Sequence, residues 1–159
     1  MSSEFFVKLW RLVHLFFAFS FVGSLVVAEW NGRAARATSD WGQRAALFRV
    51  AFLASRAYGF ASLVLLGVFG NLASLGLGFS MRSDTWMRWV NGLWIVTVAV
   101  MVLLVLPAAG RLAAASRAAA AGGTPEGYDS ALARWRFGNV LLSVLYLAFL
   151  VLMVYAWRS

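Results

Sequence analysis

His14 has the widest chemical repertoire of any side chain in this sequence, and it lies within a run of apolar residues. An imidazole can ligate haem iron or copper, relay a proton, or hydrogen-bond a neighbouring helix. An ionisable group inside an apolar helix is costly unless it faces other protein groups. His14 is therefore the first candidate cofactor or metal ligand, and a purely structural hydrogen bond is the alternative.

Other polar or sulfur-bearing side chains are expected at the depth of His14. If the apolar stretches are helices that alternate in direction, the starts of the first and third meet the ends of the second and fourth. The predicted layer adds four residues to His14: Asn71, Asn91, Met153 and, slightly shallower, Met87. Haem b would take the single histidine and a methionine as axial ligands, unless a homodimer supplied a second histidine. Copper(I), which methionine sulfur also suits, is one alternative, and simple core packing without a cofactor is another.

Two further patterns concern packing. Small residues form a row at helical spacing: Ser55, Gly59, Ser62, Gly70 and Ala73. This row predicts close approach of a neighbouring helix or of a second copy, or a gap that admits a flat ligand. Gly67 and Asn71 lie roughly 100° round the helix from the row, so Asn71 needs a partner of its own.

The last apolar stretch has a polar face: Arg136, Asn139, Ser143 and Tyr146. This face is suited to guiding an acidic or propionate-bearing ligand, or to hydrogen bonding between helices. On the first stretch, the spacing of Glu29 and Arg33 predicts a local ion pair, with Arg56 as a competing partner.

Several kinds of chemistry are excluded. The sequence has no cysteine, which removes disulfides, iron–sulfur clusters and thiolate metal sites. It has no HExxH pair, no Walker loop, no acidic cluster for calcium or magnesium, and no convincing catalytic triad. Hydrolysis is therefore not expected. A channel or carrier would need mid-membrane charges or paired broken helices, which the sequence does not show. Whether the protein is an enzyme stays open.

The elements that must position these residues follow from composition. Of 159 residues, 62% are apolar and 13% are charged, too few charges to cover a soluble domain. Four apolar stretches, at approximately 5–30, 47–79, 86–109 and 137–157, are long enough to cross a bilayer. We predict an all-α, four-helix transmembrane bundle that forms one domain, 1–159. Asp40 is suited to capping a lead-in helix, and the tract 113–121 to a helical extension.

The positive charges predict an orientation. Nine arginines flank the connections after the first and third stretches, against five basic residues near the termini and the middle connection. By the positive-inside rule both termini lie outside, in a multi-pass protein of a bacterial inner membrane. The net charge of +8 is assigned to topology and anionic lipid, not to nucleic acid. A cleaved signal peptide fits the first stretch less well, because its apolar run is too long.

A family resemblance adds to this interpretation. The first stretch carries a motif of leucine, apolar residue, histidine, six variable positions, aromatic, apolar residue and glycine: Leu12, Val13, His14, Phe21, Val22 and Gly23. Later positions that match are Leu104, Pro107, Arg111, Leu112 and Trp135. Over nearly its whole length the chain resembles the predicted integral membrane protein family of unknown function numbered 2269.

Two better-described groups share the first-helix pattern. They are the bacterial copper-resistance D family and the small four-helix membrane protoporphyrinogen oxidases, which bind haem b. His14 matches their first-helix histidine, so the resemblance implies a haem or copper role. The oxidases' further histidines and the lysine of a later helix have no counterpart here.

The favoured expectation is a small bacterial membrane protein with a haem-binding or redox role centred on His14. The alternatives are a non-catalytic accessory or assembly subunit of a larger membrane complex, and a copper-handling protein. The expected partners are the lipid bilayer and either another membrane subunit or a second copy of the chain.

Overall fold

The computed structural model describes residues 3–156, and helices joined by three short connections account for nearly all of them. The elements in chain order are α1 (Ser3–Ala37), α2 (Trp41–Leu53), η1 (Ala54–Phe60), α3 (Ala61–Gly76), α4 (Thr85–Val100), η2 (Met101–Val105), α5 (Leu106–Ala120) and α6 (Tyr128–Ala156). Because α2, η1 and α3 are continuous, as are α4, η2 and α5, the described chain forms four long helices. The predicted all-α fold of four helices, each long and apolar enough to span a membrane, is confirmed.

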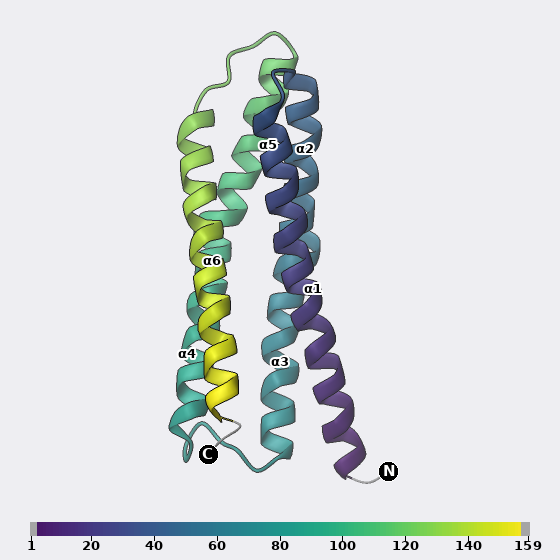
Figure 1. Cartoon of the computed structure of the whole chain (residues 1–159), viewed down its shortest axis with the longest axis vertical. Helices are drawn as coiled ribbons and strands as arrows, with labels where there is room; N and C mark the ends of the chain where they lie inside the picture. The colour runs from purple at the N-terminus through teal and green to yellow at the C-terminus, as the bar shows by residue number, and fades with distance from the viewer. Residues whose placement is uncertain (1–2, 157–159) are drawn as a thin grey trace.

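The four helices run up and down (Figure 1). The start of α1, the end of α6 and the middle connection lie at one end of the bundle, and the other two connections lie at the opposite end. The first of these, 38–40, is much shorter than the loop expected after residue 30, because α1 continues to Ala37 and α2 starts at Trp41.

Asp40 is the N-cap of α2, as predicted, and its Oδ1 accepts from the backbone N–H of Gly42 at 2.7 Å. The alanine-rich tract forms the end of α5 as predicted, and Gly122 turns the chain with φ +85°.

Two π-helical segments, η1 and η2, interrupt the middle helices. The second ends two residues before Pro107, whose ring would clash with the carbonyl four residues earlier in a regular α-helix. The wider π turn relieves that clash without ending the helix. Gly59 of η1 lies where an added Cβ would be 2.6 Å from Oγ of Ser24 on α1 and 3.0 Å from Cε of Met101 on η2. Three of the four long helices therefore meet closely at this level.

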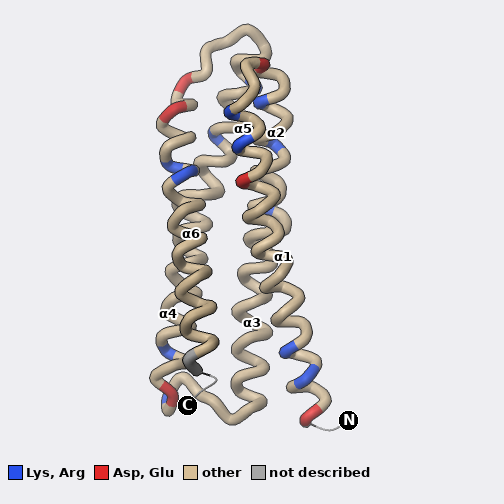
Figure 2. The backbone as a smooth tube through the Cα atoms, viewed as in Figure 1, with Lys and Arg blue, Asp and Glu red and all other residues tan. Residues whose placement is uncertain are grey.

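Charge divides the bundle along its length (Figure 2). A helix of 36 residues is about 54 Å long, whereas the hydrocarbon core of a bilayer is roughly 30 Å thick. Each long helix has one stretch without charged residues: 12–28, 57–76, 89–110 and 137–156. We call these stretches the apolar part. We call the end of the bundle formed by residues 29–56 and 111–136 the arginine end, because it carries nine of the basic residues.

The arginine end has its own aromatic core. Trp135 is fully buried and packs edge-on against Phe48, with ring centroids 6.2 Å apart. Tyr128 packs in the same manner against both Phe48 and Trp41. The guanidinium carbon of Arg44 lies 4.5 Å from the centroid of the Trp41 ring. These contacts join α2 to α6 through buried aromatic rings, as in the core of a soluble helical bundle.

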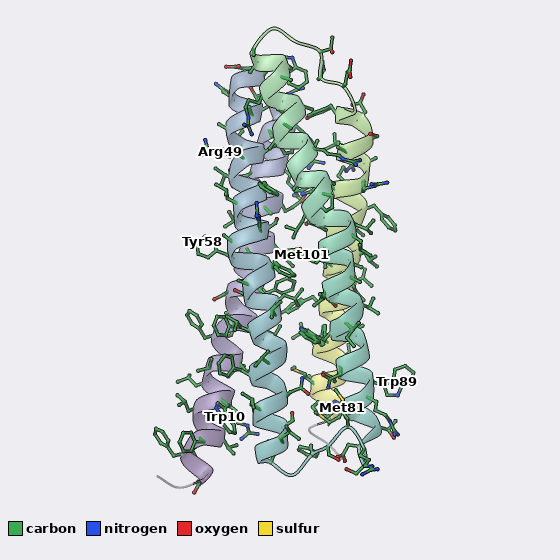
Figure 3. All side chains as sticks on the ribbon, turned by 180° about the vertical axis from the view of Figure 1, so that it is seen from behind. Trp10, Arg49, Tyr58, Met81, Trp89 and Met101 are labelled. Carbon is green, nitrogen blue, oxygen red and sulfur yellow. The ribbon has the colours of Figure 1, made fainter. Side chains whose placement is uncertain are left out.

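In the apolar part large side chains point outward. Tyr58 and Trp89 project from opposite sides of the bundle, whereas Met101 lies between the helices (Figure 3). Tyr58 is 70% exposed and Trp89 is 68% exposed, while Met101 is fully buried. Outward aromatic and aliphatic side chains are what a lipid environment requires.

The long helices pack as a row of neighbours, and one side of the bundle is left open. α1 packs on α2, η1 and α3, α2 packs on α5, and α6 packs on α4, η2 and α5. The first and last helices, α1 and α6, make no comparable backbone contact. The side between α1 and α6 is therefore where a cavity can form.

Candidate functional site

A groove runs along the open side between α1 and α6. It consists of two adjoining cavities of about 410 Å³ and 460 Å³, which share Leu25, Glu29, Arg33 and Ser143 as lining residues. The first cavity is also lined by Arg36, Arg136, Asn139 and Val140. The second is also lined by Val22, Val26, Trp30, Tyr146 and Leu147. We call the two together the α1–α6 groove.

Helical periodicity on both walls produces the groove. The lining residues of α1 recur at steps of three and four from Val22 to Arg36, and those of α6 do the same from Arg136 to Leu147. The charged lining residues all lie toward the arginine end of their helices, and the lining residues farthest from it are apolar or tyrosine. The groove therefore changes from charged to apolar along its length.

An ion-pair cluster forms the α1 wall at the charged end. Nε of Arg33 donates to Oε1 of Glu29 at 2.9 Å, which confirms the pair expected from the sequence. Nη2 of Arg36 lies 3.6 Å from the same oxygen. The second partner of Glu29 is thus Arg36, one turn further along α1, and not Arg56, whose guanidinium carbon lies 5.8 Å from the centroid of the Phe52 ring.

Arg136 faces this cluster from α6. Within the described residues it forms no ion pair, whereas Glu29 is already engaged by Arg33 and Arg36. The charged end of the groove thus contains three guanidinium groups and one carboxylate.

The polar face of α6 is directed into the groove. Nδ2 of Asn139 donates to the carbonyl of Trp135, and the hydroxyl of Ser143 donates to the carbonyl of Asn139, each at 2.9 Å. Both bonds stay within α6, so the alternative of hydrogen bonding between helices does not describe these two residues. Arg136, Asn139, Ser143 and Tyr146 instead share a wall of the groove.

Trp135 links the two walls at the level of this cluster. Its ring lies so close to Gly32 of α1 that an added Cβ there would overlap the indole. Glycine at this position lets the tryptophan reach across from α6 to α1. The contact sets the spacing of α1 and α6 beside the charged end of the groove.

His14 lies elsewhere, packed on α3 in the apolar part. Its Nδ1 is 2.9 Å from the carbonyl oxygen of Leu66. A carbonyl only accepts, so Nδ1 is the donor in this bond. Gly70 makes room for the imidazole, because an added Cβ would be 2.8 Å from Nδ1. The small-residue row thus packs closely on α1 at Gly70, as it does at Gly59.

The structure brings some of the other candidate residues together. Nδ2 of Asn71 donates to Oδ1 of Asn91 at 2.8 Å, joining α3 to α4. Asn91 in turn donates to the carbonyl of the buried Met87. The separate partner expected for Asn71 is therefore Asn91, and the neighbouring Gly67 faces Trp94 of α4. Met153 of α6 is 38% exposed.

These contacts separate the candidate ligands into two groups. His14 belongs to the packed pair of α1 and α3, whereas Met87 and Met153 belong to the packed pair of α4 and α6. Among the described residues there is no cluster of three or more histidine, cysteine, aspartate or glutamate side chains that could hold a metal ion.

The groove as a whole could not be predicted from the sequence. The α6 wall and the pair of Glu29 with Arg33 were predictable, but their position opposite each other was not. Arg36 was the available signal, because it continues the helical face of Glu29 and Arg33. Nothing in the sequence indicated that α1 and α6 would be left apart.

Comparison of the chain with protein-family models, with curated proteins and with solved structures gives no match. The resemblance based on the first-helix histidine motif therefore stays a prediction. The candidate function rests on the geometry of the groove.

Proposed function

We propose that this membrane protein binds an anionic amphiphile, a lipid-like molecule with an acidic head group, in the α1–α6 groove. The observation that carries the proposal is the change from charged to apolar lining along one groove on the open side of the bundle. The head group would lie among the arginines and the hydrocarbon chain along the apolar lining. The polar face of the last apolar stretch already suggested an acidic ligand from the sequence.

Arginine is suited to the head-group end. Its guanidinium donates two parallel hydrogen bonds to a carboxylate or phosphate, and it is weakly hydrated compared with an ammonium group. Arg33 and Arg36 approach from one wall and Arg136 from the other, so one acidic head group can be held from two sides. Because Arg136 has no acidic partner among the described residues, binding an anion there breaks no existing ion pair.

The groove also has a route for the ligand. Val26 and Val140, which line it, are each more than 60% exposed. Side chains exposed in the apolar part face lipid, so a hydrocarbon chain can enter sideways from the bilayer. With the arginine end in the cytoplasm, as the positive-inside rule favours, the head group would come from the inner leaflet.

The test compares lipid retention by the purified protein. Detergent-solubilised protein is mixed with dioleoyl phosphatidic acid or dioleoyl phosphatidylcholine, and bound lipid is counted by native mass spectrometry. We expect the acidic lipid to bind preferentially and Arg136→Gln to weaken it about tenfold, the effect of losing one charge-assisted hydrogen bond. Arg134→Gln is the matched control, because Arg134 is exposed on the same helix and does not line the groove. Equal binding of both lipids would refute the proposal.

A second candidate function is the haem or redox role of His14. The favouring observation is that Nδ1 donates to the backbone of α3, as the second nitrogen of metal-bound histidines commonly does, so that Nε2 is the nitrogen that would bind a metal. Bound haem would supply one-electron chemistry, and His14 would hold its iron. Such a site is separate from the groove, since His14 and Glu29 are about 22 Å apart along α1.

An absorption spectrum tests this second candidate. A Soret band in the purified protein that is lost in His14→Ala supports it, and a colourless, metal-free preparation counts against both haem and copper. Partner chains that co-purify in fixed stoichiometry would favour the accessory-subunit prediction.

A further inference from the structure

We infer that the α1–α6 groove prefers a doubly charged phosphomonoester head group over a singly charged phosphodiester. This inference rests on the proposed function and specifies its ligand class. It follows from the number of charges that line the groove and from their placement on two walls.

The lining charges are unequal in number. Arg33, Arg36 and Arg136 contribute three positive charges and Glu29 one negative charge, which leaves a net charge of two. A phosphomonoester carries about 1.5 to 2 negative charges at neutral pH, and a phosphodiester carries about one. The phosphomonoester therefore neutralises the site, whereas the phosphodiester leaves one positive charge uncompensated.

The arrangement strengthens this difference. Glu29 and its two arginine partners lie on α1, and Arg136 lies on α6. A phosphomonoester has three terminal oxygens, enough to accept from both walls at once, whereas a phosphodiester has two. Because electrostatic attraction scales with the product of the charges, removing one arginine weakens binding of the dianion more than that of the monoanion.

Glu29 limits the charge of the site. Its carboxylate accepts from Nε of Arg33 at 2.9 Å, so part of that guanidinium is already occupied. Glu29→Gln would raise the net charge of the lining to three. We expect this variant to bind both anionic head groups more tightly and the dianion by the larger factor.

The experiment uses three lipids with identical dioleoyl chains: phosphatidic acid, phosphatidylmethanol and phosphatidylcholine. Phosphatidylmethanol differs from phosphatidic acid by one methyl group, which removes the second negative charge. Binding to the detergent-solubilised full chain is measured by native mass spectrometry at pH 7.5. We expect phosphatidic acid to bind about fivefold more tightly than phosphatidylmethanol, and the ratio to fall below about twofold in Arg136→Gln.

The outcomes separate the two proposals. Equal binding of phosphatidic acid and phosphatidylmethanol, both above phosphatidylcholine, overturns this inference and leaves the proposed function standing. No preference for either anionic lipid overturns the proposed function as well. A ratio that Arg136→Gln leaves unchanged also overturns the inference. Arg36→Gln provides an independent variant if Arg136→Gln does not fold, and Arg134→Gln is expected to keep the wild-type ratio.

Discussion

The arginine end and the apolar part of this bundle are held together by different interactions. In the arginine end the helices meet through buried aromatic rings, with Trp135 and Phe48 fully buried and Tyr128 and Trp41 packed around them. Among the described residues, the side-chain hydrogen bonds that join different long helices all lie toward the other end. They are His14 to Leu66, Asn71 to Asn91, Trp94 to Leu63 and Trp86 to Leu152.

A bilayer around the apolar part, with water around the arginine end, would explain the difference. Where water reaches the helices, burying aromatic surface is strongly favourable, and an apolar core forms as in a soluble bundle. Within hydrocarbon there is no such gain, because lipid chains are as apolar as leucine. Close packing at small residues and hydrogen bonds between helices then supply the association. The α1–α6 groove lies where these two regions meet.

The largest expected effect comes from breaking the aromatic core. Trp135→Ala should lower the free energy of unfolding by about 3–5 kcal/mol, the usual cost of truncating a fully buried aromatic residue. Thermal unfolding of the detergent-solubilised protein, followed by circular dichroism, measures the change. Trp89→Ala removes an equally large but exposed ring and should have little effect.

A further variant identifies the source of that effect. Nε1 of Trp135 has no hydrogen-bond partner among the described residues, so Trp135→Phe should retain most of the stability that Trp135→Ala loses. If the two tryptophan-to-alanine variants were equally unstable, the aromatic core would not distinguish the arginine end from the rest.

The next effect concerns close packing in the apolar part. Gly70→Ala adds a Cβ that would lie 2.8 Å from Nδ1 of His14, which forces α1 and α3 apart and disturbs the bond from His14 to Leu66. Overpacking of this kind costs about 1–3 kcal/mol, to be measured by the same unfolding assay. Gly92→Ala is the matched control, because nothing lies within 4 Å of an added Cβ there. Equal stability of the two variants would contradict close packing of α1 on α3.

A smaller effect is expected for the hydrogen bond between α3 and α4. A double-mutant cycle with Asn71→Ala and Asn91→Ala should give a coupling energy of about 0.6–2 kcal/mol, as for other hydrogen bonds between membrane helices. Unfolding free energies of the four proteins in the cycle supply the value. Strictly additive losses would mean that this bond does not join the helices.

The smallest effect concerns the connection between α3 and α4, which lies opposite the arginine end. Hydrogen bonds from the backbone of Ser80 and the hydroxyl of Ser83 lower the pKa of Asp84 below its ordinary value of 3.8. The ionised carboxylate therefore stabilises the folded chain above pH 3.8, and this contribution disappears as the pH falls through the lowered pKa. Thermal midpoints between pH 7 and pH 3 should fall slightly more for the wild type than for Asp84→Asn. Parallel profiles would show that these bonds do not contribute to stability.

Much of the fold was predictable because it depends on local properties of the sequence. Apolar stretches of sufficient length, Asp40 as an N-cap and the spacing of Glu29 and Arg33 each involve residues within a few positions of one another. Helical periodicity also placed Asn71 and Gly70 on different faces of one helix, and the structure has them facing α4 and α1. Such features follow from backbone geometry alone.

Only half of the candidate site was predictable, because local spacing describes each helix face but not which faces lie opposite each other. The polar face of α6 and the charged face of α1 can each be found from their own spacing, but their position across one groove cannot. It depends on Trp135 reaching Gly32 of α1, a contact between residues about a hundred positions apart. His14 could likewise be identified from its own stretch, but only the tertiary structure placed its Nδ1 on the carbonyl oxygen of Leu66 in α3.

The sequence by itself therefore determined four helices long and apolar enough to cross a membrane, and the polarity of each helix face, because hydropathy and periodicity act within one helix. Only the tertiary structure decided which faces meet. Side-chain volume and glycine placement brought α1 onto α3 and left α1 apart from α6, and the charged groove exists because that one side of the bundle stayed open.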